Sequence, residues 1–242
     1  MTSFNNKIVW ITGASSGIGA ALAKAFAAQG AHIILSGRRV SALQEVADEI
    51  ATGKTADTLV LPFEVTQYDA LAGYVEQAWA WKGRVDILVN NAGISQRSLA
   101  VHTSPQVYTD LLNVDLIAPI WLTQLQLPHM VQAGGGHIVA ISSLAGRFGA
   151  PLRTAYCAAK HGLIGYMDAL RSEVALPHNI NVTNVLPGSV ATQVAQNALT
   201  GDGSSNAKAE DNIDNGDDPM DCAVAILDAV HNNVPELVYA KG

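Results

Sequence analysis

The sequence is poor in cysteine, in charge and in long apolar runs, and each shortage excludes a class of protein. Two cysteines in 242 residues cannot build a disulfide framework, which fits a reducing compartment. Charged residues make up 14% and hydrophobic residues 49% of the chain, which excludes intrinsic disorder. No apolar run reaches the roughly 18–20 residues of a membrane span, and residues 1–7 do not resemble a signal peptide. We therefore expect a soluble, cytoplasmic protein.

The chain also lacks a basic stripe and a metal-ligand pattern. The formal net charge is −7, and the excess of acids is concentrated between Thr200 and Cys222. The remainder is close to neutral, so no surface is predicted for nucleic acid or anionic lipid. No pair or triplet with metal-ligand spacing is formed by the scattered histidines, which include His102, His129, His137, His161 and His178. We expect no metal site.

Short β-rich runs alternate with longer helical patterns almost to the end of the chain. The runs are continuously apolar, which is typical of strands buried on both faces. Strands are expected at residues 7–12, 32–36, 58–63, 86–89, 137–142, 180–186 and 236–239. Helices are expected at 17–29, 41–50, 68–81, 105–130, 154–176 and 219–231. This order predicts one α/β domain over 1–242, a Rossmann-type doubly wound sheet of about seven parallel strands with helices on both faces.

A glycine-rich turn follows the first expected strand. Gly13, Gly17 and Gly19 lie between that strand and an alanine-rich helix. In this context glycines allow a tight turn and a close approach to a pyrophosphate, while the helix N-terminus supplies N–H groups. The spacing differs from G-x-G-x-x-G, and a plain strand-to-helix turn would use the same residues.

The end of the second expected strand bears on the choice between two dinucleotides. An acid there accepts hydrogen bonds from the ribose hydroxyls of NAD, but this chain has Gly37, Arg38 and Arg39 in its place. A guanidinium is well shaped to bind a 2′-phosphate. The alternative is that both arginines are solvated charges before a helix. We predict that NADP(H) is preferred, with NAD(H) also accepted.

A tyrosine, a lysine and a serine provide the parts for proton transfer to a carbonyl. Tyr156 and Lys160 are four residues apart on one helix and so share a face. A free phenol is a weak acid at neutral pH, and a nearby ammonium favours its ionised form. Ser142 and Ser143 end a buried strand, at the sheet edge where ligands bind in such folds. Together they could protonate a carbonyl while hydride arrives from a nicotinamide.

Taken in order, these motifs resemble those of the classical short-chain dehydrogenases/reductases (SDR) over about residues 7–192. Ser143 stands thirteen residues before Tyr156, and residues 156–160 match the family's Y-x-x-x-K. The resemblance implies that Tyr156 is the general acid in reduction and that Ser143 orients the substrate carbonyl. It implies that Lys160 favours the tyrosinate and binds the nicotinamide ribose, and that Asn113 positions a water in the relay to Lys160.

The resemblance also implies a cofactor-binding set. Besides Tyr156 and Lys160, that set comprises Gly13, Ser15, Ser16, Gly17, Ile18, Gly19, Arg38, Arg39, Glu64, Val65, Asn91, Ala92, Gly93, Pro187, Gly188, Val190 and Thr192. One departure is Glu64, which stands where the family usually has an aspartate beside the adenine.

These features predict an NADP(H)-dependent oxidoreductase that interconverts a carbonyl compound and its alcohol. A second hypothesis is a non-catalytic dinucleotide-binding regulator, and a third is an NAD(P)-dependent epimerase or dehydratase. The set of Ser143, Tyr156, Lys160 and Asn113 argues against a regulator, which needs no proton donor beside a lysine. The substrate itself is not determined by the sequence.

Three expectations concern the surroundings of the site. Residues 144–154 should line the substrate pocket, with Phe148, Pro151 and Leu152 favouring an apolar or amphipathic substrate. Residues 193–220 should form a substrate loop, and its part from 200 to 218 has the composition of a mobile lid. The long helices expected at 105–130 and 154–176 are apolar around most of their circumference, which predicts a homodimer or homotetramer.

Overall fold

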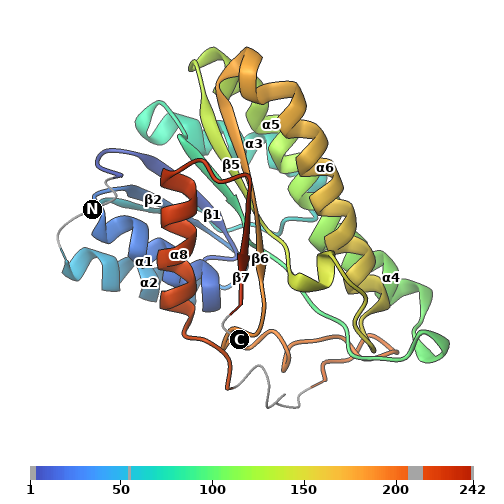
Figure 1. Ribbon diagram of the computed structural model, residues 1–242. Helices are drawn as coiled ribbons and strands as arrows, with labels where there is room; N and C mark the ends of the chain where they lie inside the picture. Colours follow the sequence, from blue (N-terminus) through green and yellow to red (C-terminus); the bar gives the residue numbers. More distant parts are fainter. Residues whose placement is uncertain (1–3, 54–55, 207–214, 241–242) are drawn as a thin grey trace.

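The computed structural model describes residues 4–53, 56–206 and 215–240, and these residues build one parallel sheet of seven strands. The strand order is β3-β2-β1-β4-β5-β6-β7, and every neighbouring pair is parallel. The strands are β1 (Ile8–Thr12), β2 (His32–Ser36), β3 (Thr58–Val60), β4 (Ile87–Asn90), β5 (Gly136–Ile141), β6 (Ile180–Pro187) and β7 (Glu236–Tyr239). This confirms the predicted doubly wound sheet (Figure 1).

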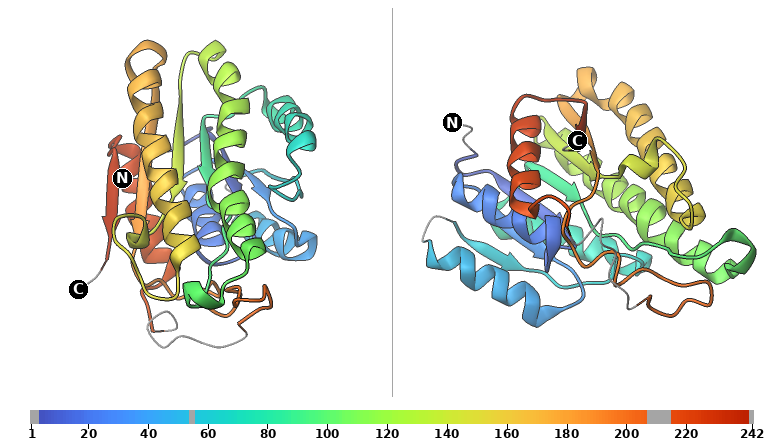
Figure 2. Two further views of the ribbon diagram at one scale, coloured as in Figure 1. Left: turned by 90° about the vertical axis from the view of Figure 1, so that its right-hand side faces the viewer. Right: turned by 60° about the horizontal axis from the view of Figure 1, so that its bottom comes forward.

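Helices cover both faces of the sheet, as Figures 1 and 2 show. One face carries α1 (Gly17–Ala28), α2 (Val40–Thr52) and α8 (Pro219–His231). The other carries α3 (Tyr68–Lys82), α5 (Ala118–Gln132) and α6 (Thr154–His178), and α4 (Pro105–Leu112) packs against the start of α6. Three shorter turns are η1 (Ala100–His102), η2 (Asn113–Ile117) and η3 (Leu144–Gly146).

Strand β1 shows why the strands are continuously apolar. Val9 and Ile11 belong to the core formed with α1, α2 and α8, whereas Ile8 and Trp10 belong to the core on the opposite face. Successive side chains of a strand point to opposite faces, so each position here meets a helix layer. The indole N–H of Trp10 is satisfied by the Ser36 hydroxyl at 2.8 Å.

Two expected elements differ from those observed. Strand β3 ends at Val60 rather than at residue 63, although the Leu61 and Phe63 N–H groups still donate to the Leu35 and Gly37 carbonyls. The helix expected over 105–130 is divided into α4, η2 and α5, and η2 is a π-helical turn. Such turns are frequent at functional sites.

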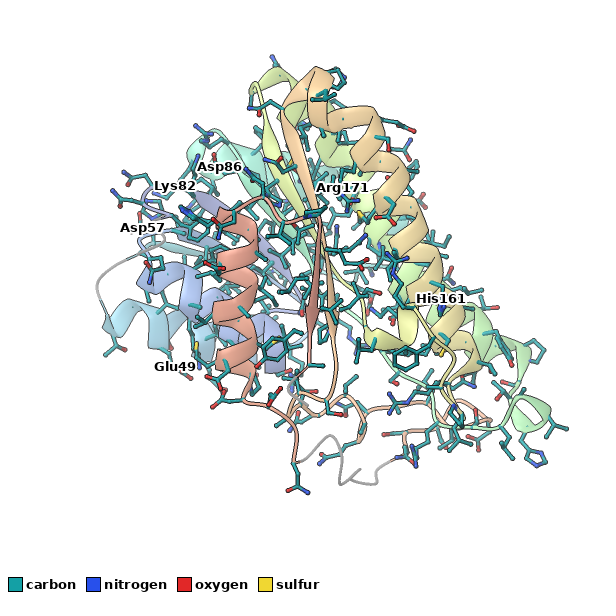
Figure 3. All side chains as sticks on the ribbon, viewed as in Figure 1. Glu49, Asp57, Lys82, Asp86, His161 and Arg171 are labelled. Carbon is teal, nitrogen blue, oxygen red and sulfur yellow. The ribbon has the colours of Figure 1, made fainter. Side chains whose placement is uncertain are left out.

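The sheet topology locates the site. Strand order reverses between β1 and β4, and ligands of open α/β sheets bind beyond the carboxyl ends of the strands at that point. The opposite edge is structural: Asp86, which precedes β4, accepts a hydrogen bond from the Ile8 N–H and pairs with Lys7 and Arg84 (Figure 3). In the described part of the chain, no helix has both the length and the apolar character to cross a membrane.

Candidate active site

A cleft of about 810 Å³ opens at the carboxyl edge of the sheet and brings nearly all predicted site residues together. The predicted residues that line it are Gly13, Ser15, Ser16, Gly17, Ile18, Arg38, Arg39, Glu64, Val65, Asn91, Ala92, Gly93, Asn113, Ser143, Tyr156, Lys160, Pro187, Gly188, Val190 and Thr192. Of the predicted set, Gly19 is the one that does not line the cleft.

The glycine turn is built by close backbone contacts with the loop after β4. A Cβ at Gly13 would lie 2.8 Å from the Cα of Ala92, and Gly13 has a φ of +65°. A Cβ at Gly19 would lie 2.3 Å from the Gly13 carbonyl oxygen, so this glycine packs the start of α1 against the turn. Its role is therefore structural. The Asn91 amide fixes the turn by donating to the Thr12 and Gly13 carbonyls.

The two arginines after β2 take different positions. The Nε of Arg38 lies 3.4 Å from Glu64 Oε2, and the Arg38 side chain is 73% exposed. Arg39 instead reaches over the turn, where its Nη2 donates to the hydroxyls of Ser15 at 3.1 Å and Ser16 at 3.0 Å. A cationic rim thus borders the turn, and Arg39 is the arginine that contacts its serines.

Ser143, Tyr156 and Lys160 meet in the cleft as the spacing predicted. Ser143 follows β5, and its Oγ accepts a hydrogen bond from the Ala145 N–H at 3.1 Å. Tyr156 and Lys160 lie one turn apart on α6, and the Lys160 Nζ is 5.6 Å from the centre of the Tyr156 ring. The lysine is buried, and its Nζ donates to the Ile141 carbonyl at 3.1 Å.

A residue that the sequence reasoning missed completes this group. Asp115, fully buried in η2, places Oδ2 3.4 Å from the Lys160 Nζ and accepts a hydrogen bond from the Ile94 N–H at 2.8 Å. Burial raises the pKa of the Asp115 carboxyl, and Lys160 opposes that shift. Burial alone would lower the pKa of Lys160, but the Asp115 carboxylate and Tyr156 hold it above its ordinary value.

For Asn113, the expected role in the relay to Lys160 stays a prediction. Asn113 lines the cleft and its carbonyl accepts a hydrogen bond from the Tyr68 hydroxyl, but the residue of this segment that contacts Lys160 is Asp115. A buried acid in an otherwise apolar helical segment was the available signal.

The segment after β6 closes the cleft from the other side. A Cβ at Gly17 would lie 3.0 Å from Thr192 Cγ2, so this segment contacts the glycine turn. Further on, the Leu199 N–H donates to the Ser95 carbonyl and the Arg97 N–H donates to the Leu199 carbonyl, both at 2.8 Å. The predicted substrate loop is therefore bonded to the loop after β4 at Leu199, directly before the part that is predicted to be a mobile lid. Residues 207–214, its central part, lie outside the described residues.

The substrate end of the cleft differs from the expectation. Phe148 is 55% exposed, and neither it nor Pro151 or Leu152 is among the lining residues. Other side chains that line the cleft are mixed in character and include Ile94, Arg153, Gln193, Val194, Asn197 and Leu199.

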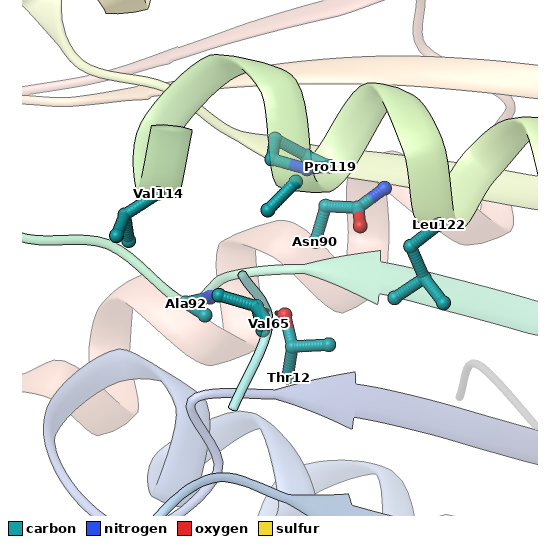
Figure 4. A pocket seen from close by; sticks show the side chains of 8 residues that line it. Thr12, Val65, Asn90, Ala92, Val114, Pro119 and Leu122 are labelled. Atoms are coloured by element: carbon teal, nitrogen blue, oxygen red, sulfur yellow. Dashed lines mark hydrogen bonds between the residues drawn. The ribbon is translucent and has the colours of Figure 1, made fainter. Parts of the chain in front are cut away.

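Two further observations concern a second cavity and possible metal ligands. A separate cavity of about 10 Å³ lies between Thr12, Asn90 and Leu122 and is too small for a substrate (Figure 4). No cluster of three or more histidine, cysteine, aspartate or glutamate side chains suited to a metal ion occurs within residues 4–53, 56–206 and 215–240.

Curated relatives agree with the fold and the motifs. The chain is 38% identical over 240 residues to dehydrogenase/reductase SDR family member 7B of Bos taurus. The matched region covers 97% of this chain and 74% of the relative. It is 40% identical over 198 residues to dehydrogenase/reductase SDR family member 7 of Homo sapiens, covering 81% of this chain and 58% of the relative.

Solved structures give the same result. A short-chain dehydrogenase from Streptomyces avermitilis superposes with a TM-score of 0.84 at 31% identity, covering 97% of this chain and 89% of that one. A short-chain dehydrogenase/reductase from Burkholderia phymatum, solved in complex with NAD, gives a TM-score of 0.88 at 21% identity, covering 98% and 90%. The latter likeness concerns the fold. The family model described as short chain dehydrogenase matches residues 7–202. The chain therefore belongs to the short-chain dehydrogenase family.

Proposed function

We propose that the protein is an NADP(H)-dependent oxidoreductase that interconverts a carbonyl compound and its alcohol, with Tyr156 as general acid and base. The observation that carries this proposal is that Ser143, Tyr156 and Lys160 line the same cleft as the glycine turn. A proton donor and a dinucleotide cradle in one space are what a coupled hydride and proton transfer needs.

The residues present fit a nicotinamide dinucleotide. Gly13, Gly17 and Gly19 keep the turn free of side chains at points where a Cβ would lie 2.3–3.0 Å from neighbouring atoms. The N-terminal N–H groups of α1 follow this turn, and such groups suit a pyrophosphate. Lys160 would hold the nicotinamide ribose, and the segment at Gly188, Val190 and Thr192 would hold the carboxamide. When bound, the nicotinamide supplies or accepts the hydride.

The chain's own side chains handle the proton and the substrate. In reduction, the Tyr156 hydroxyl donates its proton to the substrate oxygen as the alcohol forms, and the Lys160 ammonium stabilises the tyrosinate left behind. Ser143 already accepts a hydrogen bond from the Ala145 N–H, and no described residue accepts its proton. That proton is available to the substrate carbonyl. In oxidation the same groups act in reverse.

The preference for NADP(H) is supported by the rim of the cleft. Arg38, Arg39, Ser15 and Ser16 gather beside the turn, and Gly37 replaces the acid that would repel a 2′-phosphate. Glu64 holds one side of Arg38 but leaves that side chain 73% exposed. Two guanidinium groups and two hydroxyls can then share the phosphate.

A panel assay tests the proposal directly. Purified protein is mixed with NADPH or NADP⁺ and with a set of ketones, aldehydes and alcohols, and the reduced-nicotinamide absorbance is followed. We expect a change in absorbance that depends on both cofactor and substrate. Cofactor binding without turnover of any carbonyl or alcohol would favour a regulator, whereas substrate conversion without a net absorbance change would favour an epimerase or dehydratase.

A further inference from the structure

A carboxylate and an ammonium are buried together beneath the proposed proton donor. Asp115 is 0% exposed and Lys160 is 4% exposed, and their charged atoms lie 3.4 Å apart. The second carboxylate oxygen is held by the Ile94 N–H. A Cβ at Gly93 would lie 3.4 Å from Asp115 Oδ1 and 3.5 Å from the Lys160 Nζ, so the backbone there covers the pair closely.

Because Lys160 is buried, its charge depends on the groups that surround its ammonium. A lysine removed from water loses its charge unless an opposite charge or hydrogen-bond acceptors stabilise the ammonium. Lys160 has one carbonyl acceptor, that of Ile141, and one carboxylate, that of Asp115. A neutral carbonyl offsets less of the desolvation penalty than a carboxylate does.

Among the described residues, Asp115 is the only acid that faces this lysine. Tyr156, on the same helix, is the other titratable neighbour. Strand β5 contributes the Ile141 carbonyl, the loop after β4 contributes the Gly93 backbone, and Ser142 next to η3 bonds the Lys160 carbonyl rather than its amine.

We propose that Asp115 is the counterion that keeps Lys160 charged inside the cleft, and is therefore a positioning residue for proton transfer at Tyr156. This role rests on the proposed function only for its catalytic consequence, since the ion pair itself requires no cofactor. Without Asp115 the lysine would lose its proton at a lower pH, and the tyrosinate would lose the positive charge beside it.

Lysine titration tests the ion pair without any activity. Protein carrying ¹³C at lysine Cε is titrated by NMR, and the Lys160 signal is assigned by its loss in Lys160→Met. We expect the midpoint of the parent Lys160 to lie above that of an exposed lysine. In Asp115→Asn the midpoint should fall by at least about one pH unit. A smaller shift would overturn the proposal.

A second buried aspartate provides the matched control. Asp86 also pairs with an ammonium at 3.4 Å and accepts a backbone hydrogen bond at 2.8 Å, but it lies at the opposite edge of the sheet (Figure 3). Asp86→Asn should reduce stability and leave the Lys160 midpoint unchanged. An equal shift in both variants would mean that general loosening, not the counterion, moves the lysine.

The pH profile links the pair to catalysis. In Asp115→Asn the alkaline limb of kcat/KM should move to lower pH by the same amount as the lysine midpoint, whereas a purely structural loss would lower activity equally at every pH. If the parent turns over no carbonyl or alcohol, the proposed function fails while the titration still decides the ion pair.

A double variant covers the case in which Asp115→Asn does not fold. Removing one member of a buried pair leaves an uncompensated charge, whereas removing both does not. Asp115→Asn with Lys160→Met should then recover folding, measured as the thermal midpoint. A double variant no more stable than Asp115→Asn would contradict the proposal.

Discussion

Tyr156 packs against a small apolar cluster and also lines the cleft. The cluster is formed by Val107, Leu111 and Ala155, against which the tyrosine packs. The ring is thereby held while the rest of the residue lines the cleft beside Lys160. At the scale of one residue, the proposed chemistry thus depends on a single hydroxyl.

Replacing Tyr156 by phenylalanine should therefore remove turnover and spare cofactor binding. The change deletes the transferable proton and little contact area, so we expect kcat to fall by roughly 10²–10⁴-fold. Cofactor affinity, measured by nicotinamide fluorescence, should stay near that of the parent. Tyr108→Phe is the control, because the Tyr108 hydroxyl bonds Thr154 in the same cluster. Activity of Tyr156→Phe within tenfold of the parent would refute the assignment.

Cofactor choice is the second prediction at this scale. A charge-assisted hydrogen bond contributes roughly 1.5–3 kcal/mol, so NADPH should be preferred over NADH by about ten- to a hundredfold. Gly37→Asp combined with Arg38→Leu should reverse this preference. A Cβ at Gly37 would meet its nearest neighbour, Leu43, at 3.7 Å, so the aspartate fits.

The measurement is kcat/KM for both cofactors at fixed ionic strength. Arg39→Leu serves as a comparison, since Arg39 contacts Ser15 and Ser16 while Arg38 pairs with Glu64. A parent that favours NADH, or a preference unchanged in both the Arg38 and the Arg39 variants, would show that this rim does not bind a phosphate.

At the scale of elements, the continuous run of α4, η2 and α5 has one side that faces the cleft and another that faces solvent. Asp115 points into the cleft and is fully buried, whereas Ile117 and Trp121 are 41% and 40% exposed on the outer side. A π-helical turn closes i→i+5 hydrogen bonds where an α-helical turn closes i→i+4 bonds, so it changes the side of the helix on which later residues emerge. The same turn therefore shapes both the site and the outer surface.

Strand β5 contains a buried titratable group that makes stability depend on pH. His137 bonds the Thr183 hydroxyl at 2.8 Å, and burial lowers its pKa to about 4. The neutral ring is thus favoured in the folded state. Its contribution to stability is complete above the unfolded pKa of about 6.5 and is lost as pH falls from there toward 4, by up to about 3 kcal/mol.

Chemical denaturation between pH 7 and pH 4 measures this effect. His137→Gln should show a weaker fall in unfolding free energy over that range than the parent does. His102→Gln is the control, because His102 is exposed on the surface. If His137→Gln and the parent lose stability in parallel, His137 does not carry the dependence.

At the scale of the whole molecule, α5 and α6 form an outer layer whose far side no described element covers (Figure 2). A tryptophan that is 40% exposed beside an exposed isoleucine is typical of a protein interface. We propose that this face joins copies of the chain into a homodimer or homotetramer.

Light scattering tests the assembly. The parent should have at least twice the chain mass of 25.4 kDa at micromolar concentration. Trp121→Glu should yield monomers, because a charge placed in the interface would be buried without a partner. Val101→Glu, which changes an apolar residue that is 81% exposed outside these two helices, should keep the parent's mass. A parent that is monomeric would disprove the interface.

The sequence by itself determined the strand and helix alternation, the glycine turn, and the pairing of Tyr156 with Lys160 on one face of α6. These features depend on local periods and on backbone freedom, which a few neighbouring residues specify. The order of the motifs along the chain also indicated the family that the comparisons then showed.

Only the tertiary structure decided which distant residues meet. It placed Asp115 beside Lys160, Arg39 over Ser15 and Ser16, and Leu199 against the loop after β4. It also placed Phe148 outside the cleft. Each outcome depends on how separate elements pack and on one irregular turn in a helix, and a regular period along the chain carries no information about either.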